Sequence, residues 1–123
     1  MGIEWLLGKT IRNIEVLKKE EGYPDDKIVF STGGEALTMF REKEGSCEFY
    51  IEGVVGKLNK LLNSPITIAE EITEEGQTDY DDNIVWTFYK VGTCNGYVTI
   101  WWNGSCDGSY SKTPKFKVCK EEN

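Results

Sequence analysis

Alternation of apolar and polar residues through the first third of the chain predicts antiparallel strands. Residues 10–19 are rich in Ile, Val and Leu and favour a first strand. Residues 27–32 alternate so that Ile28 and Phe30 share one face of a second strand, and a glycine pair then reverses the chain into a third strand over residues 36–41. We therefore expect a hairpin here, preceded by a short helical turn near the N-terminus.

The hydrophobic period changes between residues 53 and 62. Apolar side chains recur there at steps of three and four residues, which is the spacing of one face of a helix. These side chains are Val54, Leu58, Leu61 and Leu62. Pro65 ends the pattern, because the residue before a proline disfavours the helical conformation. The pattern predicts one principal helix at residues 54–62.

The strongest local signal is a hairpin formed by two aromatic and β-branched runs, residues 84–91 and 97–103. The connection contains Asn-Gly at positions 95–96, the pair preferred at the centre of a type I′ turn, which needs positive φ at both positions. A turn centred on this pair fixes the register of the whole hairpin and places Lys90 opposite Trp101.

This register gives the hairpin two faces of different chemistry. One face is almost wholly apolar and is expected in the core; it carries Tyr89, Val91, Val98, Ile100 and Trp102. The other, which we call the mixed face, combines aromatic rings with one cation and several hydroxyl or amide groups. It carries Trp86, Phe88, Lys90, Thr99, Trp101, Asn103 and Ser105. Such a face is suited to stacking a base beside phosphate and ribose oxygens, or to packing under the helix or at a subunit interface.

A segment rich in glycine and hydroxyl groups follows the hairpin and offers further donors for an anion. Its glycine spacing differs from that of a nucleotide-binding P-loop. We predict a ligand-binding site made of this segment and the mixed face. Its residues are Trp86, Phe88, Lys90, Trp101, Asn103, Ser105, Asp107, Ser109, Tyr110 and Ser111.

Together these patterns predict an α+β fold in a single domain, residues 1–123. We expect a twisted antiparallel sheet of about six or seven strands with the principal helix packed on it. The length suits one hydrophobic core, and 39% hydrophobic with 12% aromatic residues is typical of a globular chain.

The charge distribution is uneven, with 14 basic against 21 acidic residues and a net charge of −7. No basic residue lies between Lys60 and Lys90, whereas the acidic residues there are Glu70, Glu71, Glu74, Glu75, Asp79, Asp81 and Asp82. The segment has three interpretations: a solvated strand end and loop, an acidic docking patch, or a cation site at residues 79–82. Residues 79–82 lack the glycine of a calcium-binding loop. The acidic balance disfavours direct binding to nucleic acid.

The composition excludes several function classes. Histidine is absent, so no imidazole base and no Ser-His or Cys-His pair is available. The four cysteines form no C-x-x-C pair, so a structural zinc site is not expected, and no cofactor and no metal-ligating residue is predicted. No apolar run is long enough to span a membrane, and the N-terminus lacks a signal-peptide pattern, so we expect a cytoplasmic protein. A binding protein is favoured over an enzyme, although carboxylates alone can support hydrolysis.

Several strings of the chain resemble a small uncharacterised family common in bacteriophages and prophages. The most specific part is Trp86-Thr87-Phe88-Tyr89-Lys90, and the resemblance extends over most of the chain, from about Gly8 to Ser111. Further matching positions are Cys47-Glu48, Ile51-Glu52, Gly56, Leu58, Leu61, Pro65, Ile66, Ala69-Glu70-Glu71, Gly96 to Ile100, Trp102 to Gly104, Gly108 and Tyr110-Ser111.

That family is in turn similar to the Thoeris anti-defence sponges, which sequester cyclic ADP-ribose isomers and, in some cases, cyclic oligonucleotides. The resemblance implies a phage protein of the host cytoplasm, a homo-oligomer, that holds a small anionic cyclic nucleotide without turnover. The family often has Arg where this chain has Trp101, which leaves Lys90, Arg41, Lys57 or Lys112 to contact phosphate. The alternative is an acidic phage inhibitor, comparable to anti-CRISPR DNA mimics, whose segment 70–82 docks on a basic host protein.

Overall fold

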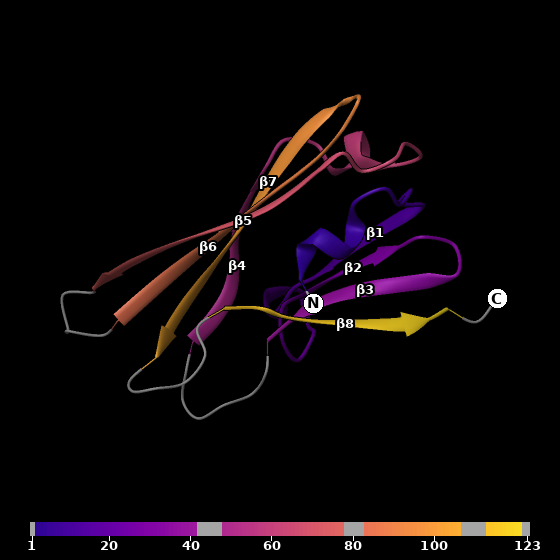
Figure 1. Cartoon of the computed structure of the whole chain (residues 1–123). Coiled ribbons are helices and arrows are strands. Elements are labelled where there is room, and N and C mark those ends of the chain that lie inside the picture. The colour runs from indigo at the N-terminus through magenta and orange to yellow at the C-terminus, as the bar shows by residue number, and fades with distance from the viewer. Residues whose placement is uncertain (1, 42–47, 78–82, 107–112, 122–123) are drawn as a thin grey trace.

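The computed structural model describes residues 2–41, 48–77, 83–106 and 113–121, which form two four-stranded antiparallel sheets (Figure 1). The first sheet has the order β1-β2-β3-β8, with β1 (Asn13–Leu17), β2 (Lys27–Ser31), β3 (Glu35–Phe40) and β8 (Lys115–Lys120). The second has the order β4-β7-β6-β5, with β4 (Glu48–Val55), β5 (Ile68–Gln77), β6 (Asn83–Thr93) and β7 (Gly96–Cys106). Three short 3₁₀ helices complete the described elements: η1 (Ile3–Leu6), η2 (Lys19–Glu21) and η3 (Leu58–Leu61). None of them is long and apolar enough to cross a membrane.

The predicted α+β fold, with one sheet and one principal helix, is wrong. The described residues form eight strands in two sheets and no α-helix. Within the segment predicted as the helix, Val54 pairs with Ile100 as part of β4, Gly56 adopts a left-handed φ of 101°, and only η3 is helical. A nine-residue helix is marginal in water, so pairing with β7 and burial of Leu61 determine the structure of this segment.

The alternation in the first third of the chain gave correct predictions. The expected strands correspond to β1, β2 and β3, and the expected N-terminal turn is η1. Ile28 and Phe30 are fully buried on the same face of β2, as the period of two residues requires.

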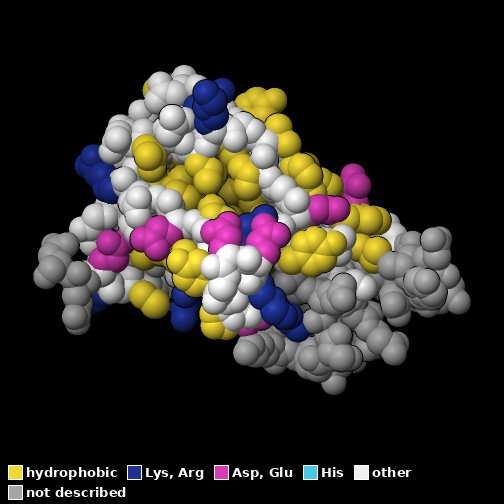
Figure 2. All heavy atoms as spheres, turned by 180° about the vertical axis from the view of Figure 1, so that it is seen from behind, with side chains coloured by type: hydrophobic (Ala, Val, Ile, Leu, Met, Phe, Trp, Pro, Cys, Tyr) yellow, Lys and Arg dark blue, Asp and Glu magenta, His cyan; other side chains and the backbone are white. Residues whose placement is uncertain are grey.

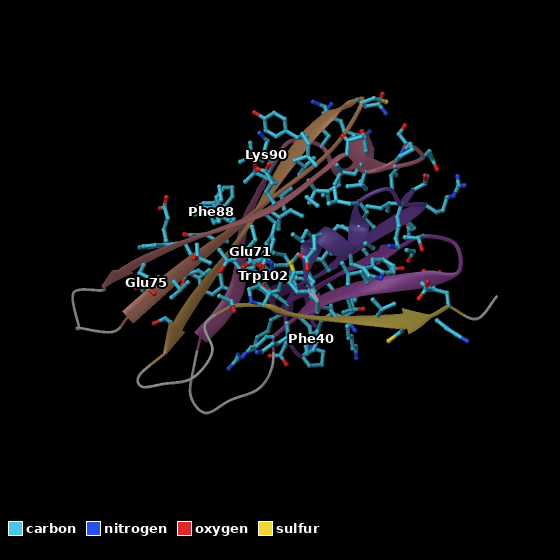
Figure 3. The ribbon with its side chains drawn as sticks, viewed as in Figure 1. Phe40, Glu71, Glu75, Phe88, Lys90 and Trp102 are labelled. Atoms are coloured by element: carbon cyan, nitrogen blue, oxygen red, sulfur yellow. The ribbon has the colours of Figure 1, made fainter. Side chains whose placement is uncertain are left out.

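The core lies between the two sheets and receives side chains from both. The first sheet contributes Ile28, Phe30, Leu37 and Met39, and the second contributes Tyr89, Val91, Val98, Ile100 and Trp102, all fully buried. The Trp102 Nε1–H donates to Met39 Sδ at 2.8 Å, and the Tyr89 ring meets Phe116 edge-on at 5.6 Å. Figure 3 shows Trp102 between the sheets, with Phe88 and Lys90 on the opposite side of the second sheet.

One buried carboxylate connects the segment before β2 to β4 of the second sheet. Asp26 precedes β2 and is only 6% exposed. Its Oδ1 accepts the backbone N–H of Lys19 at 2.7 Å, and its Oδ2 accepts the backbone N–H of Ile51 in β4 at 2.8 Å. Both oxygens are therefore used to position backbone rather than to bind solvent.

Candidate functional site

The hairpin that carries the predicted site forms, but its register differs from the prediction by two residues. Phe88, rather than Lys90, pairs with Trp101, and Lys90 pairs with Thr99. Among the described residues only Asn63 has a positive φ outside glycine, so Asn95 does not adopt the conformation that a type I′ turn needs. The turn residues are Cys94 and Asn95, and Gly96, with φ of 125°, begins β7.

Contacts outside the hairpin explain this turn. Thr93 Oγ1 donates to the carbonyl of Lys60 at 2.7 Å and accepts the backbone N–H of Asn95 at 3.1 Å. The Asn95 side-chain amide also donates to Ser64 Oγ at 3.2 Å. The turn is thus fixed to the segment around η3, which a local turn signal cannot reveal.

The two-residue shift leaves every side chain on its predicted face, because side chains alternate with a period of two. The apolar face is buried in the core as predicted. The mixed face points away from the first sheet, and the structure brings together on it Trp86, Phe88, Lys90, Trp101, Asn103 and Ser105. Asn103 is only 8% exposed, so it offers little surface, whereas the other five are partly exposed.

The two tryptophans of the mixed face lie over glycines of the neighbouring strands. A Cβ added to Gly53 in β4 would lie 2.6 Å from the Cη2 and Cζ2 atoms of Trp101. A Cβ added to Gly76 in β5 would likewise lie 2.6 Å from Cζ3 of Trp86. Each indole therefore covers bare backbone, which holds its ring close to the sheet.

Phe88 and Lys90 continue this surface between the tryptophans and the hairpin turn (Figure 3). The Phe88 ring centroid is 6.3 Å from that of Trp101, with the planes inclined by 32°. Lys90 Nζ lies 4.4 Å from the ring centroid of Tyr97, a cation–π contact. Tyr97 is 56% exposed, so this end of the surface is open to solvent.

The acidic strand β5 borders the mixed face, a feature that the sequence analysis did not include in the site. Glu70 pairs with Lys90 and Glu74 with Trp86, so both carboxylates share the face with the aromatic rings. Figure 2 shows acidic side chains beside exposed hydrophobic ones on the side of the molecule that it views. The sequence contained a signal for this border. The alternation that assigns the side chains of β6 to two faces applies equally to the acidic strand beside it. These charges oppose an anionic group on this face, and Glu70 lies directly across from Lys90, the cation predicted to hold that group.

The remaining predicted site residues have different outcomes. The segment that contains Asp107, Ser109, Tyr110 and Ser111 lies outside the described residues, as do Lys112 and the predicted cation site at 79–82. Arg41 is on the first sheet's side, 3.8 Å from Asp25, and Lys57 is exposed before η3. Within the described part of the chain, no cluster of three Cys, Asp or Glu side chains is arranged to hold a metal ion.

Tyr89 faces the core beneath the mixed face, and the pKa of its hydroxyl is shifted. Burial raises the pKa of its hydroxyl above the ordinary value of 10.0, and the carboxylates of Glu71 and Glu4 act in the same direction. The folded state therefore keeps this proton at a pH at which the unfolded chain releases it.

We expect this proton to make the protein sensitive to alkali. The neutral Tyr89 hydroxyl contributes its full stabilisation below about pH 10. Above this pH the free energy of unfolding falls by about 1.4 kcal/mol per pH unit for one proton. Tyr89→Phe should remove this dependence in urea unfolding curves measured from pH 8 to 11.5. Thr87→Val removes a neighbouring buried hydroxyl that does not titrate and should leave the alkaline slope unchanged. Equal slopes in Tyr89→Phe and the parent protein would contradict the assignment.

Comparison with known proteins places the chain in a family. The model of a family described as "Domain of unknown function (DUF7448)" matches residues 4–116, so the chain belongs to this family. Searches of curated proteins and of solved structures find no match.

Proposed function

We propose that this protein is a phage-encoded binding protein that sequesters a cyclic nucleotide immune signal, such as a cyclic ADP-ribose isomer, without turning it over. The observation that supports the proposal is the pair of tryptophans held over glycines on the outer face of the second sheet. An aromatic surface fixed in advance binds a planar ring without the entropy cost of ordering the side chains. The ligand's anionic group then lies at Lys90, beside the exposed Tyr97 ring.

Other features of the same face are consistent with a homo-oligomer. Val55 and Ile72 are 58% and 55% exposed on β4 and β5, the two edge strands that flank the aromatic rings. Exposed apolar side chains around a small binding surface favour cover by a second subunit, which would also exclude water from the ligand. We propose that a second copy of the chain covers this rim.

The first test is thermal unfolding with a panel of cyclic ADP-ribose isomers, cyclic dinucleotides and cyclic trinucleotides. One member should raise Tm, and heat denaturation should release it unchanged, because only binding to the native state stabilises the protein. Trp101→Ala should weaken binding of that member about 10- to 100-fold, the loss expected for one stacked base. Gly53→Ala should also weaken it, because the new methyl group displaces the Trp101 ring without removing it.

Leu7→Ala is the matched control, since Leu7 is 47% exposed and lies in the N-terminal segment. This variant should keep the parent affinity. Unaltered affinity in both Trp101→Ala and Gly53→Ala would overturn the assignment of the site, and recovery of a chemically altered nucleotide would show an enzyme. The absence of any Tm shift would contradict the proposed ligand class.

A second candidate function is supported by the exposure of β5. Glu70, Glu71, Glu74 and Glu75 are all exposed on this edge strand, where they suit docking to a basic host protein. Charged residues also protect a sheet edge from unwanted pairing, so exposure alone does not distinguish the two roles. Replacing all four by Gln separates the functions: docking is abolished, whereas binding of an anionic nucleotide near Lys90 is retained or strengthened.

A further inference from the structure

Basic side chains surround Phe40 on the outer face of the first sheet, opposite to the face that packs in the core. In the register of the sheet, Phe40 lies between Lys27 of β2 and Lys115 of β8. Lys117 Nζ lies 5.4 Å from the centroid of the Phe40 ring, and Arg41 follows Phe40 directly in the chain. Figure 3 shows Phe40 on the side of the first sheet that faces away from the second. Four of the 14 basic residues thus meet at one end of this face.

A cavity of about 430 Å³ opens among these side chains, within the usual range of small-molecule sites. The side chains that would face a ligand there are Lys27, Arg41, Lys117, Thr38, Phe40 and Tyr23. They combine three cations with two hydroxyl groups and two aromatic rings. Lys27 and Tyr23 are exposed, so a ligand can enter from solvent.

Two acidic residues, Asp25 and Asp26, also line the cavity. Asp26 has both oxygens bound to backbone N–H groups, which disperse its negative charge. Asp25 lies 3.8 Å from Arg41 Nη1, so one of the three cations has an acidic neighbour at the cavity. Three cations against two carboxylates leave a net positive cavity in a protein of net charge −7.

We propose that this cavity is a second binding site, independent of the mixed face, for a small molecule that carries a phosphate group. Lys27 of β2 and Lys117 of β8 supply point charges for the phosphate oxygens, and the guanidinium of Arg41 adds a third positive charge beside them. Phe40 and Tyr23 contact the uncharged part of the ligand. The site lies on the opposite outer face from Trp101, so the two sites are loaded separately.

Inorganic pyrophosphate is the probe, because it has no ring to stack on the mixed face. Isothermal titration at 0.15 M salt should show saturable binding, and Lys27→Gln/Lys117→Gln should weaken it by about tenfold or more. Cys119 lines the cavity and is exposed, so pyrophosphate should slow its alkylation by iodoacetamide, followed by mass spectrometry. Cys94, in the hairpin turn of the other sheet, is the internal control and should react at an unchanged rate.

The charge-matched control is Arg12→Gln/Lys60→Gln, which removes two exposed cations outside the cavity and should retain the parent affinity. Equal loss of affinity in both double variants would indicate general charge attraction and overturn the site. Citrate binding as tightly as pyrophosphate would overturn the phosphate assignment. Pyrophosphate binding that survives Lys27→Gln/Lys117→Gln, or no saturable binding at all, would overturn the proposal without affecting the nucleotide test on Trp101.

Discussion

Trp102→Ala should lower the free energy of unfolding by about 3–5 kcal/mol, the range for removing a large aromatic side chain from a core. Trp102 is fully buried between the two sheets, and its Nε1–H donates to Met39 Sδ across the core. The substitution removes the packing of the indole against both sheets and leaves a cavity that rigid strands cannot close. Urea unfolding followed by far-ultraviolet circular dichroism measures the loss directly.

The neighbouring residue provides a matched control. Trp101 points to the outer face and is partly exposed, so Trp101→Ala should cost far less stability while weakening ligand binding. The same chemical change at adjacent positions thus separates core packing from the proposed site. A similar stability loss in both variants would contradict the assignment of the two faces.

The composition of the two hairpin faces could be predicted from sequence because it depends only on alternation. An error of two residues in register moves each side chain along its own face and never across the sheet. Trp101 and Trp102 were therefore assigned to the correct faces although the pairing of Lys90 was wrong. The cross-strand neighbours depend on the turn, and the turn depends on Thr93 binding the Lys60 carbonyl, which is 33 residues away.

The helix prediction failed because a four-residue recurrence also fits a strand followed by a short turn. Val54 faces the core from β4, and Leu61 reaches the same core from η3 after the left-handed Gly56. Both positions are apolar for one reason, burial, yet they belong to different elements. Over so short a segment, periodicity indicates which residues are buried but not which conformation buries them.

The basic cavity was not predictable because its cations are distant in sequence. Lys27 lies on β2, and Lys117 lies on β8. All four strands of the second sheet lie between β3 and β8 in the sequence, although β3 and β8 pair with each other. The family resemblance named Arg41 as one of four possible phosphate contacts for a nucleotide, but it did not place Arg41 beside Lys27 and Lys117. Only the pairing of β3 with β8 shows that Arg41 and Lys117 line the same cavity.

Asp26→Ala is expected to destabilise the protein by about 2–5 kcal/mol, because two backbone N–H groups lose a charged acceptor together. These donors belong to Lys19, before β2, and to Ile51 in β4 of the other sheet. Ile51 is itself 3% exposed, so water cannot readily replace the lost carboxylate oxygen there. Urea unfolding at pH 7 should show a lower midpoint.

Glu52→Gln is the control for this prediction, since Glu52 is exposed and directly follows Ile51 in β4. An exposed substitution of this kind changes the free energy of unfolding by about 0.5 kcal/mol or less, so this variant should unfold near the parent midpoint. Asp26→Asn should fall between the two, because its amide oxygen still accepts one N–H while its NH₂ group faces the other donor. If Asp26→Ala and Glu52→Gln unfolded at the same urea concentration, the carboxylate of Asp26 would not hold the sheets together, and its burial would reflect packing alone.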